Sequence, residues 1–267
     1  MNIDVIFLAS YALLGVFAGI LAGLLGVGGG LIIVPVLIWL FHLQGFEYDI
    51  ISHAAIGTSL ASIISTSISS ASAHHRHGAV NWKVAGQLTA GLFVGALLGS
   101  WIASDLNTRI LQLVFGLFAI TVGLQMFFKA QAVSERLLPA WPVMNAVGTV
   151  IGAVSGIVGI GGGSMTVPFL TWHNVSIRQA VATSSACGLP IAIAGFLGFM
   201  ATGWDNPAMP EYSWGYIYLP ALISVAVLSV LFAPVGAKLA HSVPVGLLKQ
   251  FFAVLLIIVG IKLTDII

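Results

Sequence analysis

The sequence is poor in charge and in cysteine. Only 6% of its 267 residues are charged, against about 25% in ordinary soluble domains. The single cysteine, Cys187, excludes a disulfide framework, and the net charge of +1 excludes a broad basic surface for nucleic acid. No Asp or Glu lies in the middle of an apolar run, so a carboxylate-based cation site or proton relay has no candidate residue.

Long apolar runs make up most of the chain, and 59% of the residues are hydrophobic. Most of these runs reach the roughly 20 residues that a membrane-spanning helix needs. The runs at 31–41 and 164–172 are shorter. The sequence therefore predicts an all-α polytopic membrane protein, with residues 1–267 forming a single transmembrane domain of 8 to 10 membrane segments.

The chain contains two related halves, residues 5–129 and 141–264. GLLGVGGGLIIVP at 23–35 aligns with GIVGIGGGSMTVP at 156–168, and AIGTS at 55–59 then falls on AVATS at 180–184. Each half is predicted to hold about four long helices and a short helix that follows a glycine-rich break. Duplicated halves of this kind are a common way of building transporters.

The charges of the loops favour an inverted arrangement of the two halves. The basic positions are loops 74–83 and 129–136 and the segment around Arg178, whereas loops 44–50 and 203–213 are acidic. If the short segments 31–43 and 164–173 each count as a crossing, all basic positions lie on one side, and the positive-inside rule places both termini outside the cytoplasm. Ten helical residues cover only about 15 Å, so partial crossing by these segments is the alternative.

The glycine clusters are the main candidates for a binding site. Four glycines within five positions would destabilise a helix by about 1 kcal/mol each relative to alanine, which predicts a break rather than a continuous helix. A short helix follows each break, so its free N–H groups and positive dipole end would face the turn and attract an anion. A purely architectural bend is the alternative. The candidate binding residues here are Gly26, Gly28, Gly29, Gly30, Gly159, Gly161, Gly162 and Gly163.

Two other roles for glycine, a nucleotide-binding loop and a helix-packing stripe, do not account for the glycine clusters. A dinucleotide fingerprint of the form G-x-G-x-x-G would need glycine where Leu31 and Ser164 stand, so a nucleotide site is excluded. Upstream of the first break, Gly15, Gly19 and Gly23 recur every four residues, which predicts close packing against another helix.

Hydroxyl and basic residues on the helix after each break supply further candidates. Hydroxyl groups would line a path for an oxyanion with neutral donors, or they would only hydrogen-bond to helix backbone. His53 and Arg178 occupy equivalent positions near the starts of these helices and would supply positive field at an entrance, or would lie at the membrane interface. The hydroxyl candidates are Thr58, Ser59, Ser62, Thr183 and Ser184.

Together these motifs resemble those of a known family. Two G-x-G-G-G stretches, each followed by a proline and by A-x-x-T-S, and the segment GAVNWK at 78–83 are similar to the sulfite exporter TauE/SafE family of bacterial membrane proteins. The resemblance implies a multi-pass permease of the cytoplasmic (inner) membrane, usually drawn with eight helices. It also implies export of small sulfur-containing anions such as sulfite, sulfoacetate or other organosulfonates.

The function predicted from the sequence is thus an exporter of a small sulfur-containing anion, and not an enzyme. An anion channel or importer of the same architecture, for thiosulfate or sulfate, stays open because no coupling residue is evident. An intramembrane enzyme is a remote alternative, since it would need a nucleophile and a base within reach.

The expected partners are a small anionic substrate and the lipid bilayer, without nucleic acid, and a homo-oligomer is left open. No cofactor or metal is expected, because His74, His75 and His77 flank Arg76 in what reads as a solvated loop without cysteine or carboxylate ligands.

Overall fold

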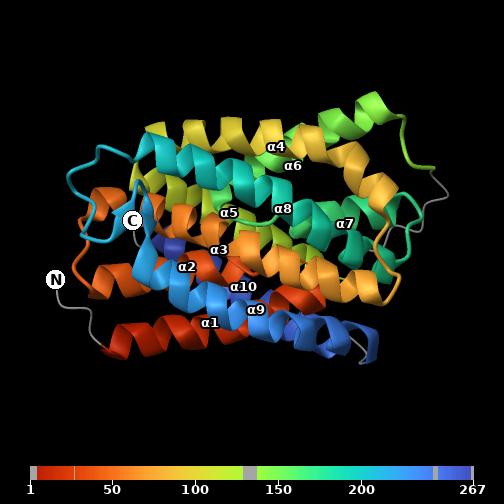
Figure 1. Cartoon of the computed structure of the whole chain (residues 1–267), viewed down its shortest axis with the longest axis horizontal. Coiled ribbons are helices and arrows are strands. Elements are labelled where there is room, and N and C mark those ends of the chain that lie inside the picture. The colour runs from red at the N-terminus through yellow and green to blue at the C-terminus, as the bar shows by residue number, and fades with distance from the viewer. Residues whose placement is uncertain (1–4, 27, 129–136, 243–245, 266–267) are drawn as a thin grey trace.

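The computed structural model describes residues 5–26, 28–128, 137–242 and 246–265, and the elements in these ranges are almost all helices (Figure 1). The all-α fold predicted from the sequence is confirmed. A short hairpin of β1 and β2 precedes the ninth helix. The elements are α1 (Val5–Leu25), α2 (Gly30–Leu43), α3 (Tyr48–Arg76), α4 (Trp82–Asp105), α5 (Thr108–Phe127), α6 (Trp141–Val158), α7 (Gly163–Trp172), α8 (Ile177–Thr202), β1 (Ser213–Trp214), β2 (Ile217–Tyr218), α9 (Leu219–Ser242) and α10 (Gly246–Asp265).

Seven of the described helices are long and apolar enough to cross a membrane, namely α1, α3, α4, α5, α6, α8 and α9. Helices α2 and α7 have 14 and 10 residues. At 1.5 Å per residue they are about 21 Å and 15 Å long, less than the roughly 30 Å of the bilayer core. Helices α3 and α8 have the largest buried shares of the seven, so they form the centre of the bundle.

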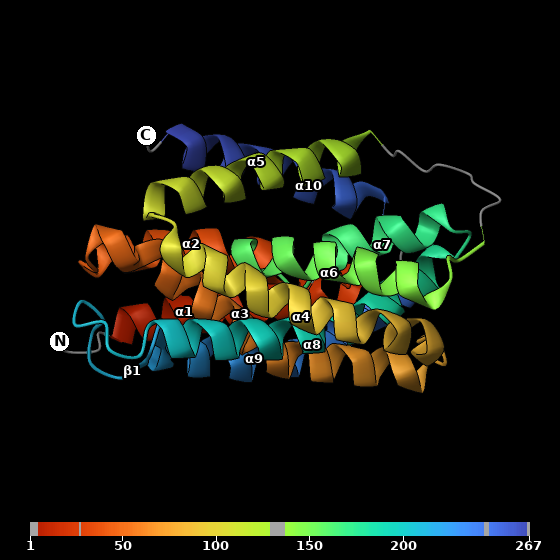
Figure 2. The same ribbon diagram turned by 90° about the horizontal axis from the view of Figure 1, so that it is seen from above.

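The first five helices and the last five are interleaved. Helix α1 packs along α9, and α4 packs along α6. Helices α3 and α8 contact each other at the centre, while α5 and α10 form a separate pair on one face of the bundle (Figure 2). The first helix of each set of five therefore lies on the fourth helix of the other set.

Small residues allow this close packing. A β-carbon built on Gly15 would lie 2.6 Å from the carbonyl oxygen of Val225, and one on Gly19 would lie 2.5 Å from that of Ser229. Since real β-carbons do not approach this closely, only glycine permits the observed distance between α1 and α9. The packing role predicted for this stripe is confirmed.

The loops lie at the two ends of the bundle. Segments 44–47 and 203–218 lie at the end where α1 begins and α10 finishes, whereas 77–81 and 173–176 lie at the opposite end (Figure 1). In this arrangement α2 and α7 each return the chain toward the end from which the preceding helix came. The inverted relation of the two halves itself remains a prediction.

Candidate functional site

Both glycine clusters form turns that interrupt the helical path. Their left-handed residues have φ between 68° and 80°, which glycine adopts without steric cost. Helices α2 and α7 begin directly after these turns, so the predicted breaks are confirmed. The left-handed positions are Gly26, Gly28 and Gly29 in the first turn and Gly159 and Gly162 in the second.

The two turns lie against each other inside the bundle. A β-carbon built on Gly28 would lie 3.2 Å from the Cα of Gly161, and one on Gly30 would lie 2.5 Å from the carbonyl oxygen of Gly159. The glycines are thus required in part because the backbone of one turn packs on the backbone of the other. We call this contact of Gly26, Gly28, Gly29 and Gly30 with residues 159–163 the glycine crossing.

The crossing brings two helix starts together. The N-caps of α2 and α7 are Gly29 and Gly162, and no side chain caps either helix. The first N–H groups of a helix have no partner within the helix, and the helix dipole places about half a positive charge there. Two such ends side by side repel each other, and a negatively charged group near them relieves that repulsion.

Two serines on the long central helices form hydrogen bonds to the crossing. Ser59 of α3 donates a hydrogen bond of 2.8 Å to the carbonyl oxygen of Gly159. Ser184 of α8 donates one of 3.0 Å to the carbonyl oxygen of Gly26. Each serine therefore satisfies a buried carbonyl of the turn that belongs to the other half of the chain.

The neighbouring threonines act in the same reciprocal way. The hydroxyl of Thr58 accepts a 3.0 Å hydrogen bond from the backbone N–H of Tyr218, and that of Thr183 accepts one of 3.0 Å from Asn81. Ser62 donates to the carbonyl oxygen of Ser59 in its own helix at 2.8 Å. All five hydroxyls therefore bond to backbone groups, as in the alternative to a substrate-lining role. A direct role in binding substrate stays a prediction.

The two basic candidates lie in different surroundings. His53 is buried, and its Nδ1 and Nε2 lie 3.1 Å and 2.9 Å from the carbonyl oxygens of Asp49 and Leu106. Its ring therefore joins the first turn of α3 to the connection between α4 and α5. Arg178 is exposed at the start of α8. The role of both in attracting an anion stays a prediction.

The histidine-rich segment departs from expectation at one residue. His74 is 1% exposed, in the last turn of α3, and its Nε2 lies 2.8 Å from the carbonyl oxygen of Gly23. The expectation that this histidine belongs to a solvated loop is wrong, because α3 continues through it to Arg76. His75 accepts a 3.1 Å hydrogen bond from the indole N–H of Trp82.

Sequence reasoning missed a set of hydroxyl groups around the second turn. Their oxygen atoms are buried and have no hydrogen-bond partner. A signal was present in the aligned motifs, since the second copy has hydroxyl residues at two positions where the first has Leu31 and Ile33. The residues are Ser67, Ser155, Ser164 and Thr166.

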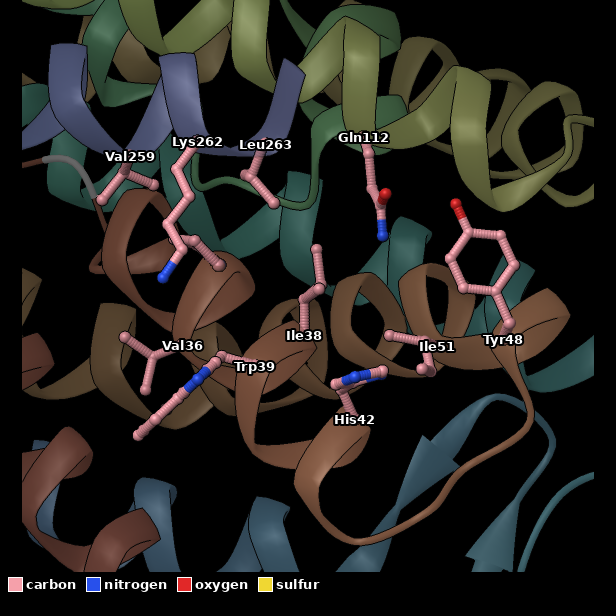
Figure 3. A pocket seen from close by; sticks show the side chains of 11 residues that line it. Val36, Ile38, Trp39, His42, Tyr48, Ile51, Gln112, Val259, Lys262 and Leu263 are labelled. Carbon is pink, nitrogen blue, oxygen red and sulfur yellow. The ribbon is translucent and has the colours of Figure 1, made fainter. Parts of the chain in front are cut away.

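A separate hollow lies between α2 and the pair formed by α5 and α10. Its volume is about 420 Å³ and its lining is mainly apolar. The side chains of Lys262 and Gln112 extend from α10 and α5 toward α2 (Figure 3). None of the candidate residues at the crossing lines this hollow, so it is a distinct place on the molecule.

The bundle of apolar helices around a crossing of two broken segments defines a polytopic membrane transport protein. The model of the sulfite exporter TauE/SafE family matches residues 11–263, and the chain belongs to this family. The membrane location expected from the sequence is confirmed.

Related proteins carry names of the same kind. A "Probable membrane transporter protein" of Haemophilus influenzae is 37% identical over 94% of this chain and 96% of the relative. "Probable membrane transporter protein YdhB" of Bacillus subtilis is 31% identical over 87% of this chain and 90% of its own. "Probable inner membrane transporter protein TsaS" of Comamonas testosteroni is 28% identical over 71% and 77%. No solved structure matches the chain significantly.

Proposed function

We propose that the protein exports small sulfur-containing anions, such as sulfite, sulfoacetate or other organosulfonates, and that the anion binds at the glycine crossing. The observation that carries this proposal is the contact of Gly28 with Gly161, which brings two uncapped helix starts together. Helix starts bind anions because their N–H groups point at the ligand and their dipoles favour negative charge.

The distribution of acidic residues supports an anion over a cation. Every acidic residue in the described ranges lies in a loop or in the terminal turn of a helix. The interior of the bundle therefore offers neutral donors and helix dipoles without a competing carboxylate. Such a site suits an anion that has to be released again on the other side. The acidic residues are Glu47, Asp49, Asp105, Asp205, Glu211 and Asp265.

Flux measurements in proteoliposomes test the function. Vesicles preloaded with sulfite, sulfoacetate, taurine or sulfate are diluted with and without a pH gradient, and efflux is compared with that from empty liposomes. We expect efflux of sulfite or of a sulfonate above the control. Absence of efflux for every sulfur anion would overturn the proposal, and dependence of the efflux on the pH gradient would contradict the lack of a candidate proton relay in the apolar runs.

A matched pair of variants tests the place of binding. Gly162 has φ of 71° at the crossing, and a β-carbon there would lie 2.5 Å from the side chain of Ile191, whereas Gly78 has φ of 65° with no atom within 4 Å of its β-carbon position. Both variants, Gly162→Ala and Gly78→Ala, introduce backbone strain at a left-handed residue. Only Gly162→Ala also disturbs the crossing, because Gly78 has no neighbours at its β-carbon position. We expect sulfite efflux to fall at least tenfold in Gly162→Ala and to stay near the wild-type rate in Gly78→Ala.

A further inference from the structure

The second glycine turn is surrounded by buried hydroxyl groups that have no partner. The oxygen atoms of Ser67, Ser155, Ser164 and Thr166 make no hydrogen bond, and the four residues are between 0% and 8% exposed. Buried polar groups are almost always hydrogen-bonded, and Ser and Thr in membrane helices usually bond to their own helix backbone. Four such exceptions near one turn provide hydroxyl groups that are available to bond to a ligand.

The hydroxyls are placed around the start of α7. The Oγ of Ser155 lies 3.2 Å from the β-carbon position of Gly162, the residue that caps α7. Ser164 lies in the first turn of that helix, and the N–H of Thr166 donates to the carbonyl oxygen of Gly162 at 2.9 Å. Helical side chains point toward the N-terminus of their helix, so the hydroxyls of α7 are directed back toward the turn.

Ser67 approaches the same turn from α3. Its Oγ lies 2.6 Å from the β-carbon position of Gly188 on α8, and that position is 3.4 Å from the carbonyl oxygen of Gly161. Gly188 leaves room for this hydroxyl beside the turn. Helices α3, α6 and α7 thus each direct at least one unpartnered hydroxyl to residues 161–163.

The first turn has the same glycine motif but none of the hydroxyls at the equivalent positions. The alignment of the glycine motifs places Ala22, Leu31 and Ile33 opposite Ser155, Ser164 and Thr166. The alignment of AIGTS with AVATS places Ala192 opposite Ser67. All four counterparts are buried apolar side chains, so the start of α2 lacks the equivalent hydroxyls.

We infer that the anion binds at the second turn alone, with its oxygen atoms accepting hydrogen bonds from Ser67, Ser155 and Ser164 and from the N–H groups that open α7. The inference rests on the proposed function and specifies its site. The ligand class is an oxyanion or sulfonate with three or more acceptor oxygens, because the donors are neutral and come from several directions. The first turn then packs against the second without supplying equivalent hydroxyls.

Substitutions that copy one half onto the other test the inference. Ser155→Ala and Ser67→Ala each introduce the alanine found at the equivalent position of the other half, Ala22 and Ala192 respectively. Ser164→Thr keeps the hydroxyl, while Ser164→Ala removes it. Initial efflux rates give the KM for sulfite, and thermal unfolding of the purified protein is followed with and without sulfite. Ser224→Ala is the control, because that hydroxyl bonds to Pro220 within α9.

We expect the KM for sulfite to rise about tenfold in Ser155→Ala, Ser67→Ala and Ser164→Ala, as for loss of a hydrogen bond to a charged ligand. The stabilisation of the protein by sulfite should shrink in the same variants, while the melting temperature without sulfite stays equal or rises. Ser164→Thr and Ser224→Ala should keep the wild-type KM.

The outcomes separate this inference from the function on which it rests. If the wild type shows neither sulfur-anion efflux nor stabilisation by sulfite, the proposed function fails. If the wild type transports sulfite and the three alanine variants keep its KM, the single-sided site is overturned and the proposed function stands. A melting temperature that rises with an unchanged KM would likewise show that the hydroxyls are only unpaired polar groups.

Discussion

The two glycine turns are similar in backbone, with left-handed glycines at equivalent first and fourth positions, Gly26 and Gly29 against Gly159 and Gly162, and they differ in their side chains. In both, left-handed glycines precede a short uncapped helix, and a serine of the other half bonds to a carbonyl of the turn. Around the second turn, however, stand Ser155 and Ser164, where the first has Ala22 and Leu31. The repeated motif therefore builds the crossing, while the residues that are not repeated supply the hydroxyls at which we propose that the anion binds.

The largest effect is expected from closing the space between the turns. A β-carbon on Gly30 would lie 2.5 Å from the carbonyl oxygen of Gly159 and 2.8 Å from the Cα of Ile160, so Gly30→Ala must push the turns apart. We expect a loss of about 3 kcal/mol in the free energy of unfolding, measured by chemical denaturation in detergent. Gly86→Ala is the control, because that helical glycine has no atom within 4 Å of its β-carbon position.

Gly86→Ala should raise stability slightly, by up to about 1 kcal/mol, since alanine favours a helix over glycine. Equal stability of the two variants would contradict a close contact between the turns.

The shared feature of the turns is tested by the two serines. Ser59→Ala and Ser184→Ala each leave a buried carbonyl oxygen without its donor, so each should cost about 2 kcal/mol of unfolding free energy. Ser62→Ala should cost less than about 1 kcal/mol, because Ser62 bonds to a carbonyl of its own helix. The losses of unfolding free energy in Ser59→Ala and Ser184→Ala should be similar. If they differ from each other by more than they differ from the loss in Ser62→Ala, the two serines are not equivalent at the crossing.

His53 and Arg178, the equivalent basic residues of the two halves, differ in burial. His53→Ala removes a buried ring that contacts the carbonyl oxygens of Asp49 and Leu106, so we expect a loss of about 2 kcal/mol in thermal or chemical unfolding. Transport by the folded fraction, measured as sulfite efflux per correctly folded protein, should then stay near the wild-type level. A fully stable His53→Ala protein that no longer transports would instead give the ring a direct role.

The smallest effect is expected at the exposed counterpart. Arg178→Ala should change the unfolding free energy by less than about 0.5 kcal/mol, because surface substitutions away from buried features have little effect. If Arg178 adds positive field at an entrance, the rate of sulfite efflux falls as ionic strength rises in the wild type and less so in the variant. Identical salt dependence would leave Arg178 as an interfacial residue.

Much of the fold could be predicted from the sequence because its signals are local. The lack of charge and the length of the apolar runs predict the membrane helices, and the density of glycine predicts the breaks before α2 and α7. The four-residue spacing of Gly15 and Gly19 predicted a packing face correctly, since any helix with that spacing carries a groove.

The candidate site was harder to predict because its bonds join residues far apart in the chain. The sequence marks Ser59 and Ser184 as hydroxyl residues on helices, but only the fold shows that they reach the turns at Gly159 and Gly26. An unpartnered hydroxyl such as that of Ser155 cannot be recognised before all its neighbours are placed. The difference between the aligned glycine motifs was visible in the sequence. Its relevance to a binding site became clear only from the positions of the hydroxyls around the second turn.

The most direct test is a structure of the protein in lipid nanodiscs with a saturating concentration of selenite, whose selenium identifies a bound sulfite analogue. We expect one selenium position at the start of α7, with the selenite oxygen atoms within hydrogen-bond distance of the hydroxyls of Ser155 and Ser164. A selenium position at the start of α2, in the hollow between α2 and α10, or nowhere within the bundle would contradict it.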